Sequence, residues 1–440
     1  MNAEIKNAEV YLWGTRIGVV HKTSDNDTYS FQYDDDFSHS GIELSPFVMP
    51  LSNNVYSFPV INNTSFNGLP GLLADSLPDK FGNAVINTWL AKNGRLPSSL
   101  NAIERLCYIG KRGFGALEYV PTIEIDDNKI IDENVDITGL TMIVSKILSD
   151  KEKIKINVDE LQLSKLLKLG TSAGGARAKA IIAINEKTGE IKSGEIDAGT
   201  DFSYWIMKFD GISGNGDHEI KDNGDYTKIE YSYYLMAKDC NIDMNECRLL
   251  ENDGLKHFIT KRFDRYIENG KMQKVHMQTL GALTHIDYNI PNLCSYEMLF
   301  SYAKRLNNDE KDMLQLFRRM VFNVLAVNCD DHVKNFSFLM NRSGEWRLSP
   351  AYDITFAYKE GNKWISRHQM TVNGKSENIT ADDMIEVGQN IGLKISKCKN
   401  IIDEEKKVIS NWLEYAKTSY VSEERANIIY SVIMKVINNT

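Results

Sequence analysis

The sequence predicts an α+β protein made of three consecutive parts. Its 440 residues are too many for one compact core, so two or three domains are expected. The first part, residues 1–123, contains short segments with the alternation of strands, and we expect a small α+β domain there. Residues 124–262 combine strands with one long helix, whereas residues 263–440 have mainly helical spacing. The second part is therefore expected to be a mixed lobe and the third a mostly helical lobe.

Within the first part, residues 10–13 and 17–20 are apolar segments on either side of a Gly14 turn, which predicts two adjoining strands. Residues 28–33 alternate polar with aromatic side chains, as a strand with one buried face does. A helix is expected near residues 84–90, and residues 103–110 end at a glycine-rich segment at 110–115. The charged residues 124–134 are interpreted as a linker.

The composition excludes several classes of protein. There are 51 lysine and arginine residues against 60 aspartate and glutamate residues, a net charge of −9, which argues against a stand-alone nucleic-acid binder. The six cysteines form no C-x-x-C pair, so free thiols in a reducing compartment are expected rather than zinc ligands or disulfides. The N-terminus is too polar for a signal peptide, and apolar runs such as residues 180–184 are too short to span a bilayer. We therefore expect a cytoplasmic protein without a membrane partner.

The pattern that carries most chemical information lies between residues 317 and 353. Apolar side chains at helical spacing predict a buried helix at residues 317–328, which ends in the polar loop Cys329-Asp-Asp-His-Val-Lys-Asn335. An apolar strand at 336–340, a turn at 341–344 and a return strand at 346–348 then lead to Asp353. A buried helix, a D-x-x-x-x-N loop, a hairpin and an aspartate occur in this order in the catalytic module of protein-kinase-like enzymes. The second and third parts are therefore expected to form a bilobal, kinase-like core.

Phosphoryl transfer explains why these residue types are needed. A carboxylate, Asp330, would orient the attacking hydroxyl group and accept its proton, and a cation, Lys334, would stabilise the transferring group. Asn335 and Asp353 offer the oxygen ligands that Mg²⁺ prefers. His332 is assigned only an orienting role. D-x-x-x-x-N is a common pattern by itself, and Asp330 and Asp331 would also be suitable helix caps, so the hypothesis depends on the ordered set.

A kinase also needs groups that hold the phosphates, and two upstream segments are candidates. Residues 170–179 are glycine-rich and precede an apolar strand; glycines allow backbone N–H groups to approach phosphate oxygens, although a plain turn is the simpler interpretation. Lys208 lies in the apolar strand at 203–209, where a buried ammonium group needs an anionic partner unless its stem reaches the surface. Glu230, on a predicted helix at 226–240, is one candidate partner, but a surface position is more usual for such a glutamate.

Taken in order, these segments resemble the HipA family of serine/threonine kinases, the toxins of bacterial toxin–antitoxin pairs. The resemblance extends over the whole chain and includes the N-terminal domain. Its markers are the sequences GLPG at 68–71, DSLPD at 75–79, TSAGGARAK at 171–179, WIMK at 205–208, KRFDR at 261–265, HMQ at 276–278, DDHVKN at 330–335 and PAYD at 350–353. One such match has little weight, whereas eight in the same order are highly specific.

The resemblance implies a HipA-type fold and a nucleotide site for ATP and Mg²⁺. The residues that it assigns to this site are Ser172, Ala173, Gly174, Gly175, Lys179, Lys208, Lys261, Arg262, Phe263, Asp330, Asn335 and Asp353. Residues 261–263 would be the hinge that contacts adenine through backbone atoms. Lys261 replaces a frequent glutamate there, a change that backbone contacts tolerate.

The resemblance also implies regulation and partners. Ser172 matches the loop serine that family members autophosphorylate, with Thr171 as the alternative acceptor, and the modified kinase is inactive. A small helix-turn-helix antitoxin would bind the kinase, so that contact with DNA is only indirect. An aminoacyl-tRNA synthetase is an expected protein substrate. Two other functions stay open: a small-molecule or lipid kinase, and a catalytically inactive co-repressor.

Overall fold

The structure of the chain is a computed structural model. It describes residues 4–24, 28–61, 63–123, 134–149, 163, 166–167, 169, 177–195, 197–212 and 225–440. The glycine-rich residues 170–176, and with them Thr171, Ser172, Ala173, Gly174 and Gly175, lie outside the described residues. In the part of the chain that is described, no helix is long and apolar enough to cross a membrane. All six cysteines are buried free thiols, as expected.

The N-terminal domain contains an antiparallel five-stranded sheet in the order β4-β3-β2-β1-β5. The strands are β1 (Asn7–Leu12), β2 (Thr15–Ser24), β3 (Thr28–Tyr33), β4 (Val55–Ser57) and β5 (Leu117–Val120). The predicted strands at 10–13, 17–20 and 28–33 fall on β1, β2 and β3 and are confirmed. The turn between β1 and β2 has positive φ at both Trp13 (49°) and Gly14 (86°), the conformation of a tight hairpin turn in which glycine is favoured.

Short helices connect the strands of this domain. They are α1 (Asp35–Ser38), α2 (Asn63–Phe66), α3 (Gly71–Ala74), α4 (Lys80–Lys92), the 3₁₀ helix η1 (Pro97–Ser99) and α5 (Ala102–Ile109). The helix expected near residues 84–90 is present as α4, and residues 102–109 form α5. Each begins at a side-chain cap: Asp79 accepts a hydrogen bond from the Gly82 amide (2.6 Å), and Asn101 forms a reciprocal capping box with Glu104.

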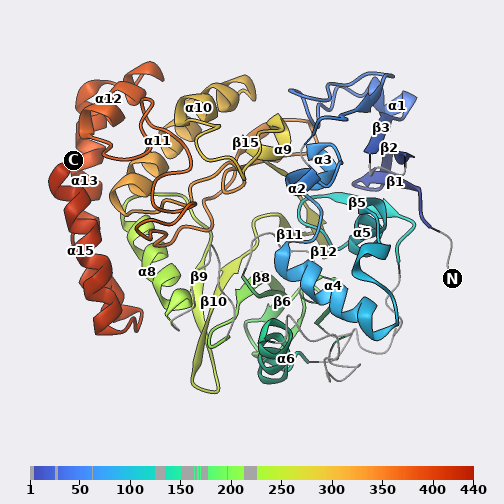
Figure 1. Ribbon diagram of the computed structural model, residues 1–440, viewed down its shortest axis with the longest axis horizontal. Helices are drawn as coiled ribbons and strands as arrows, with labels where there is room; N and C mark the ends of the chain where they lie inside the picture. Colours follow the sequence, from blue (N-terminus) through green and yellow to red (C-terminus); the bar gives the residue numbers. More distant parts are fainter. Residues whose placement is uncertain are drawn as a thin grey trace.

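The second sheet forms the mixed lobe and has the order β7-β6-β8-β10-β9, with all neighbours antiparallel. Its strands are β6 (Lys179–Asn185), β7 (Ile191–Ser193), β8 (Phe202–Lys208), β9 (Cys247–Asn252) and β10 (Leu255–Lys261). One face packs on α4 and on α6 (Ile137–Ser149) through a buried apolar cluster that includes Phe81, Leu140 and Trp205. Helix α8 (Tyr226–Asp239) packs against β9 and β10. Figure 1 shows α6 and α4 beside this sheet.

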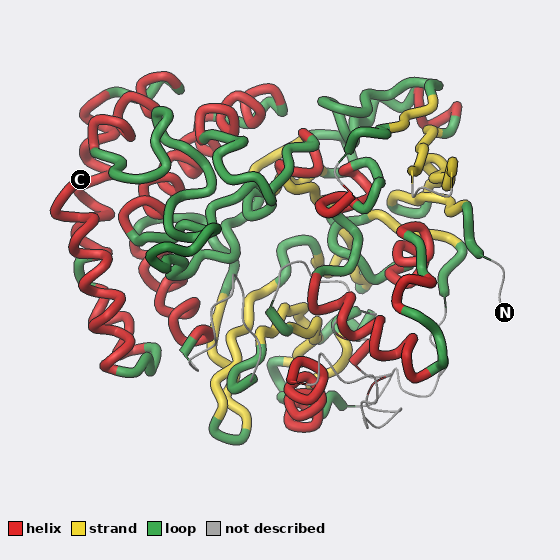
Figure 2. Tube along the Cα trace, in the orientation of Figure 1, coloured by secondary structure: helices red, strands yellow, loops and turns green. Residues whose placement is uncertain are grey.

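The C-terminal lobe is mostly helical, as predicted, and its helices gather on the side of the molecule where the C-terminus lies (Figure 2). Strands β11 (Arg265–Glu268) and β12 (Lys271–Lys274) form a hairpin, and the third sheet has the order β13-β14-β15. The strands of the third sheet are β13 (His276–Thr279), β14 (Ser337–Met340) and β15 (Trp346–Leu348). The helices are α9 (Leu280–Thr284), α10 (Tyr296–Arg305), α11 (Glu310–Leu325), α12 (Ala381–Asn390), α13 (Ile395–Ile409), α14 (Trp412–Thr418) and α15 (Glu423–Asn439).

The predicted module of helix, loop and hairpin is present as α11, residues 326–336, β14 and β15. Every residue of α11 from Leu316 to Leu325 is buried, which explains its nearly continuous apolar character. One expectation for the C-terminus is wrong: the helical spacing of residues 404–417 predicts one continuous amphipathic helix, but the chain is interrupted there between Ile409, the end of α13, and Trp412, the start of α14. Trp412, fully buried with its indole N–H donating to the Ala426 carbonyl (2.9 Å), begins a new helix there because its ring has to reach the core.

The N-terminal domain shares its core with the C-terminal lobe. A single cluster of buried apolar residues runs from Val10 and Phe31 in the first sheet to Phe322 in α11 and Trp412 in α14. Gly71 at the start of α3 lies so close to α9 that a Cβ atom there would be 2.2 Å from the Ala282 carbonyl oxygen. The domain is therefore packed tightly against the lobe that carries the predicted catalytic loop.

Candidate active site

The loop at residues 329–335 is held from both sides. The Gly281 amide at the start of α9 donates to the Val333 carbonyl (3.2 Å), and the Cys329 amide donates to the Ala357 carbonyl (3.0 Å). Within the loop, the Asn335 side-chain amide donates to the Asp330 carbonyl (2.8 Å). This bond leaves the side-chain oxygen of Asn335 as the atom that can act as a ligand. The loop is thus a pre-organised polar turn between a buried helix and a buried strand.

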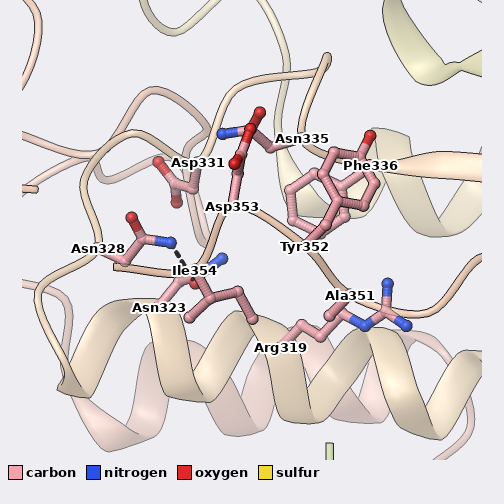
Figure 3. A pocket seen from close by; sticks show the side chains of 10 residues that line it. All are labelled: Arg319, Asn323, Asn328, Asp331, Asn335, Phe336, Ala351, Tyr352, Asp353 and Ile354. Carbon is pink, nitrogen blue, oxygen red and sulfur yellow. Dashed lines mark hydrogen bonds between the residues drawn. The ribbon is translucent and has the colours of Figure 1, made fainter. Parts of the chain in front are cut away.

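The β14–β15 hairpin returns the chain so that Asp353 lies beside Asn335, as predicted. Both side chains line a small cavity, together with Asp331 and residues of α11. Figure 3 shows the side chains of Asp353 and Asn335 next to each other above α11. Asp353 has a φ of 51°, a left-handed conformation that an aspartate rarely adopts. Such strain is concentrated at functional sites, where the surrounding structure holds it in place.

Lys208, on strand β8 of the mixed lobe, is the centre of a cluster of charged side chains. Along β8, Trp205 and Met207 point into the cluster under α4 and α6, so Lys208 points to the other face. There its ammonium group lies 2.6 Å from the Glu230 carboxylate on α8 and also bonds the Asp353 carboxylate. The lysine therefore has anionic partners, and its side chain is mostly buried, with 14% of it exposed. It joins the mixed lobe to the aspartate that follows the hairpin.

Burial and charge act in opposite directions in this cluster. Burial by itself would lower the pKa of Lys208, but Asp353 and Glu230 outweigh it and raise the pKa above its ordinary value. Burial would raise the pKa of Asp353, yet Lys208 and Lys179 lower it. For Glu230 burial prevails and the pKa is raised. The Asp353 carboxylate is thus kept ionised, as a metal ligand has to be.

The remaining loop residues lie near Tyr288. The His332 Nε2 atom is 3.7 Å from an Asp330 carboxylate oxygen, and the His332 ring centroid is 5.7 Å from that of Tyr288. The Lys334 ammonium lies 5.0 Å above the same Tyr288 ring, while its backbone carbonyl accepts from the Tyr352 hydroxyl (2.7 Å). The structure therefore places Asp330, His332 and Lys334 together on one loop. The proximity of His332 to Asp330 is compatible with an orienting role.

Asp331 is buried and holds the loop against the segment that follows Asp353. Its carboxylate accepts from the Tyr296 hydroxyl (2.9 Å), from His368 Nδ1 (2.9 Å) and from the Gln369 amide (2.8 Å). Burial would lower the pKa of His368, but Cys329 and Asp331 raise it well above its ordinary value. Helix capping, the alternative considered for Asp331, is thus replaced by a buried ion pair.

This pair predicts a pH dependence of stability. A histidine whose pKa is raised on folding contributes stability that is fully present below its unfolded pKa, about 6.5, and is lost as the pH rises through the folded value. We expect His368→Gln to cost about 3–5 kcal/mol at pH 6 and less as the pH rises toward 9, measured by urea unfolding. His285→Gln is the matched control, because burial lowers the pKa of His285 to about 4 and the ring stays neutral over this range. A loss for His368→Gln that does not change with pH would contradict the ion pair.

The residues expected to form an adenine hinge, 261–263, are bonded to other parts of the protein. The Lys261 side chain is exposed, and both backbone groups of Lys261 are bonded: its amide donates to Glu246 (2.9 Å) and its carbonyl accepts from Asn245 (3.0 Å). The Arg262 guanidinium is buried and pairs with Asp264 through two bonds of 2.8 Å. Phe263 is half-buried, with its ring 5.8 Å from that of Tyr352. Only Phe263 of the three therefore has its side chain near the Asp353 segment.

Asp264 is the centre of a buried ion cluster that the sequence did not reveal. Besides Arg262 it binds Arg265 (2.8 Å) and accepts from the Gly115 amide (2.9 Å) in the glycine-rich segment of the N-terminal domain. Arg265 in turn donates to the carbonyls of Gly113 (2.6 Å) and Gly115 (2.9 Å). Gly115 has a φ of +71°, and a Cβ atom there would lie 3.0 Å from the Met277 amide nitrogen, so glycine is needed for this approach.

The donor atoms present fit a magnesium site. Asp353 supplies a carboxylate and Asn335 an amide oxygen, and hard oxygen ligands are those that Mg²⁺ prefers. Lys208 is bonded to one Asp353 oxygen and would share that carboxylate with a metal or turn to the phosphates. A bound Mg²⁺ would neutralise charge on the phosphate oxygens.

The chain contains two domains of one family. Residues 8–120 match the HipA N-terminal domain, and residues 171–412 match the HipA-like C-terminal domain. The mixed lobe with Lys208 and the helical lobe with the loop at 329–335 meet where Lys208 bonds Asp353, and together they form a bilobal, kinase-like fold of the HipA type. The chain belongs to the HipA family.

Individual relatives are distant. A Haemophilus influenzae protein with a provisional kinase name is 26% identical over 230 residues, which cover 44% of this chain and 64% of the relative. This alignment therefore spans less than two thirds of that protein. The serine/threonine-protein kinase toxin HipA of Shewanella oneidensis is 22% identical over 379 residues, 80% of this chain and 75% of the relative. A chain of the solved complex of Shewanella oneidensis HipA, HipB and operator DNA has a similar fold, with a TM-score of 0.67 and 17% identity. The match covers 98% of this chain and 96% of that chain.

Proposed function

We propose that the protein is a protein kinase that uses ATP and Mg²⁺ to phosphorylate serine or threonine. The observation that carries this proposal is the bridge from Lys208 to Glu230 and Asp353. In kinases a strand lysine paired with a helix glutamate contacts the nucleotide phosphates, and an aspartate after the catalytic loop binds the metal. Here three elements far apart in the sequence bring these groups to one point.

The other residues take the roles that phosphoryl transfer requires. Asp330 orients the acceptor hydroxyl group and takes its proton, and His332 holds the Asp330 carboxylate. Lys334 stabilises charge on the transferred group. Asn335 and Asp353 hold Mg²⁺, and Lys208 and Lys179 hold the phosphates. Residues 261–263 and the glycine-rich residues 172–175 complete the proposed ATP site, with Ser172 or Thr171 as the autophosphorylated residue.

The family supports a particular biological role. We propose a growth-arresting toxin of the HipA type that works in the cytoplasm, is bound by a helix-turn-helix antitoxin and meets DNA only through it. The likeness to a HipA chain solved with HipB and operator DNA supports this partner class. The proposed substrate is a translation protein such as an aminoacyl-tRNA synthetase.

Labelled ATP tests the proposal. We expect the purified chain to incorporate phosphate from γ-labelled ATP only with Mg²⁺ present, and peptide mass spectrometry should place the phosphate on residue 171 or 172. Ser172→Ala and Thr171→Val, tested side by side, identify the acceptor. Asp353→Asn is the control for a contaminating kinase, because it removes the metal carboxylate. Labelling that persists in Asp353→Asn, or transfer to sugars or inositides in preference to protein, would contradict the proposal.

A further inference from the structure

Two lysines lie side by side in the mixed lobe. Lys179 at the start of β6 and Lys208 at the end of β8 are direct partners in the antiparallel register. Directly opposed residues share a face of the sheet, with Cβ atoms about 4.5–5.5 Å apart. Lys179 is only 2% exposed, so water does not screen its charge. Two lysines that start from opposed positions on one face, in largely buried surroundings, repel each other unless anions hold them.

Each lysine has a carboxylate from a different element. Glu230 on α8 binds Lys208, and Asp79 of the N-terminal domain lies 3.3 Å from the Lys179 ammonium. The side chains of Asp79 and Lys179 are 5% and 3% exposed. One Asp79 oxygen accepts from the Gly82 amide and caps α4, which leaves the other oxygen directed at Lys179. The carboxylate is therefore anchored by its own helix, as Glu230 is.

The surroundings connect this pair to the candidate active site. The charge of Lys179 contributes, after that of Lys208, to the lowered pKa of Asp353. Four residues before Asp79, the Asp75 carboxylate accepts from the Thr279 amide (2.7 Å) and hydroxyl group (2.9 Å). Thr279 immediately precedes α9, whose Gly281 amide binds the loop at Val333. The DSLPD segment thus contacts both Lys179 on the mixed lobe and Thr279, next to the helix that holds the loop at 329–335.

We propose that Asp79 is a positioning residue through which the N-terminal domain directs Lys179 at the phosphates of the bound nucleotide. This inference rests on the proposed kinase function and assigns a task to the N-terminal domain within it. Asp79 acts on Lys179 as Glu230 acts on Lys208, by fixing the direction of a flexible ammonium group. Nucleotide affinity then depends on the docked N-terminal domain, because Asp79 fixes the lysine that would contact the phosphates.

Asp79→Asn separates this role from helix capping, because asparagine caps a helix about as well as aspartate but has no charge. Mg²⁺–ATP dissociation constants from calorimetry, kcat, KM and melting temperature would be measured for Asp79→Asn, Lys179→Met and the double variant. We expect each single variant to raise the dissociation constant and KM for ATP about tenfold, the size of one lost charge-assisted contact. The double variant should equal Lys179→Met, because the two residues act through one contact.

Glu118→Gln is the matched control. Glu118 on β5 forms another ion pair between the N-terminal domain and the rest of the chain, with Lys274 (2.8 Å), but it is not a partner of Lys179 or Lys208. The Glu118→Gln variant should keep the wild-type dissociation constant and KM for ATP. The positioning role is overturned if Asp79→Asn binds ATP with wild-type affinity, or if the losses of ATP affinity in the two single variants add in the double variant. A lower melting temperature of Asp79→Asn does not alter this conclusion. A wild-type chain that binds no nucleotide defeats the proposed function as well, so the two failures are distinguishable.

Discussion

Asp330→Asn is expected to lower kcat for phosphoryl transfer about 10²–10⁴-fold, the usual contribution of a positioned general base. Asparagine has nearly the same shape but cannot accept the proton of the attacking hydroxyl group. The loop should keep its conformation, because Asn335 binds the backbone carbonyl of residue 330 and not its side chain. Lys208 and Asp353 are unaffected, so KM for ATP should change little. Steady-state kinetics with a protein acceptor would measure both constants.

Asp331→Asn provides the comparison for this variant. The two aspartates are neighbours, but Asp331 is buried and bonded to Tyr296, His368 and Gln369, whereas an Asp330 carboxylate oxygen lies 3.7 Å from His332 Nε2. Asp331→Asn should lower the melting temperature together with activity. Asp330→Asn should lower activity with little change in the melting temperature. If kcat of Asp330→Asn stays within about threefold of wild type, Asp330 is not the base.

Asp264→Asn is expected to destabilise the chain by about 3–5 kcal/mol, because two buried guanidinium groups lose the charge between them. Arg262 and Arg265 are buried on either side of this carboxylate. Burial would raise the pKa of Asp264, but the two arginines hold it well below its ordinary value. The stability it contributes is therefore present above the unfolded pKa, about 3.9, and is lost as the pH falls through the folded value.

Urea unfolding at pH 7, together with hydrogen exchange of residues 110–120, would test this prediction. In Asp264→Asn, hydrogen exchange of residues 110–120 should increase before that of other segments, since Asp264 and Arg265 bind the backbone of Gly113 and Gly115. Glu118→Gln removes a more accessible ion pair of the same interface and should cost no more than about 1 kcal/mol. Equal losses for the two variants would show that the buried cluster is not what holds the N-terminal domain in place.

Much of the fold was predictable because it depends on local patterns. The β1–β2 turn, the alternation of β3, the buried α11 and the β14–β15 hairpin all follow from residues close together in the chain. The interrupted helix between α13 and α14 was not predicted, because the continuous helical spacing did not show that Trp412 turns into the core.

For the candidate site, the sequence by itself determined the order of Asp330, Asn335 and Asp353 and the place of Lys208 in an apolar strand, since an ordered motif and an apolar strand are both local features. Only the tertiary structure decided the partners of the charged groups. Glu230 had seemed more suited to the surface, Asp79 was only a marker of resemblance, and the interaction of Asp331 with His368 had no sequence signal. Each pair joins segments 22 to 100 residues apart. Hydrophobic periodicity shows which face of a helix or strand is buried, but the packing of distant elements decides which charges meet there.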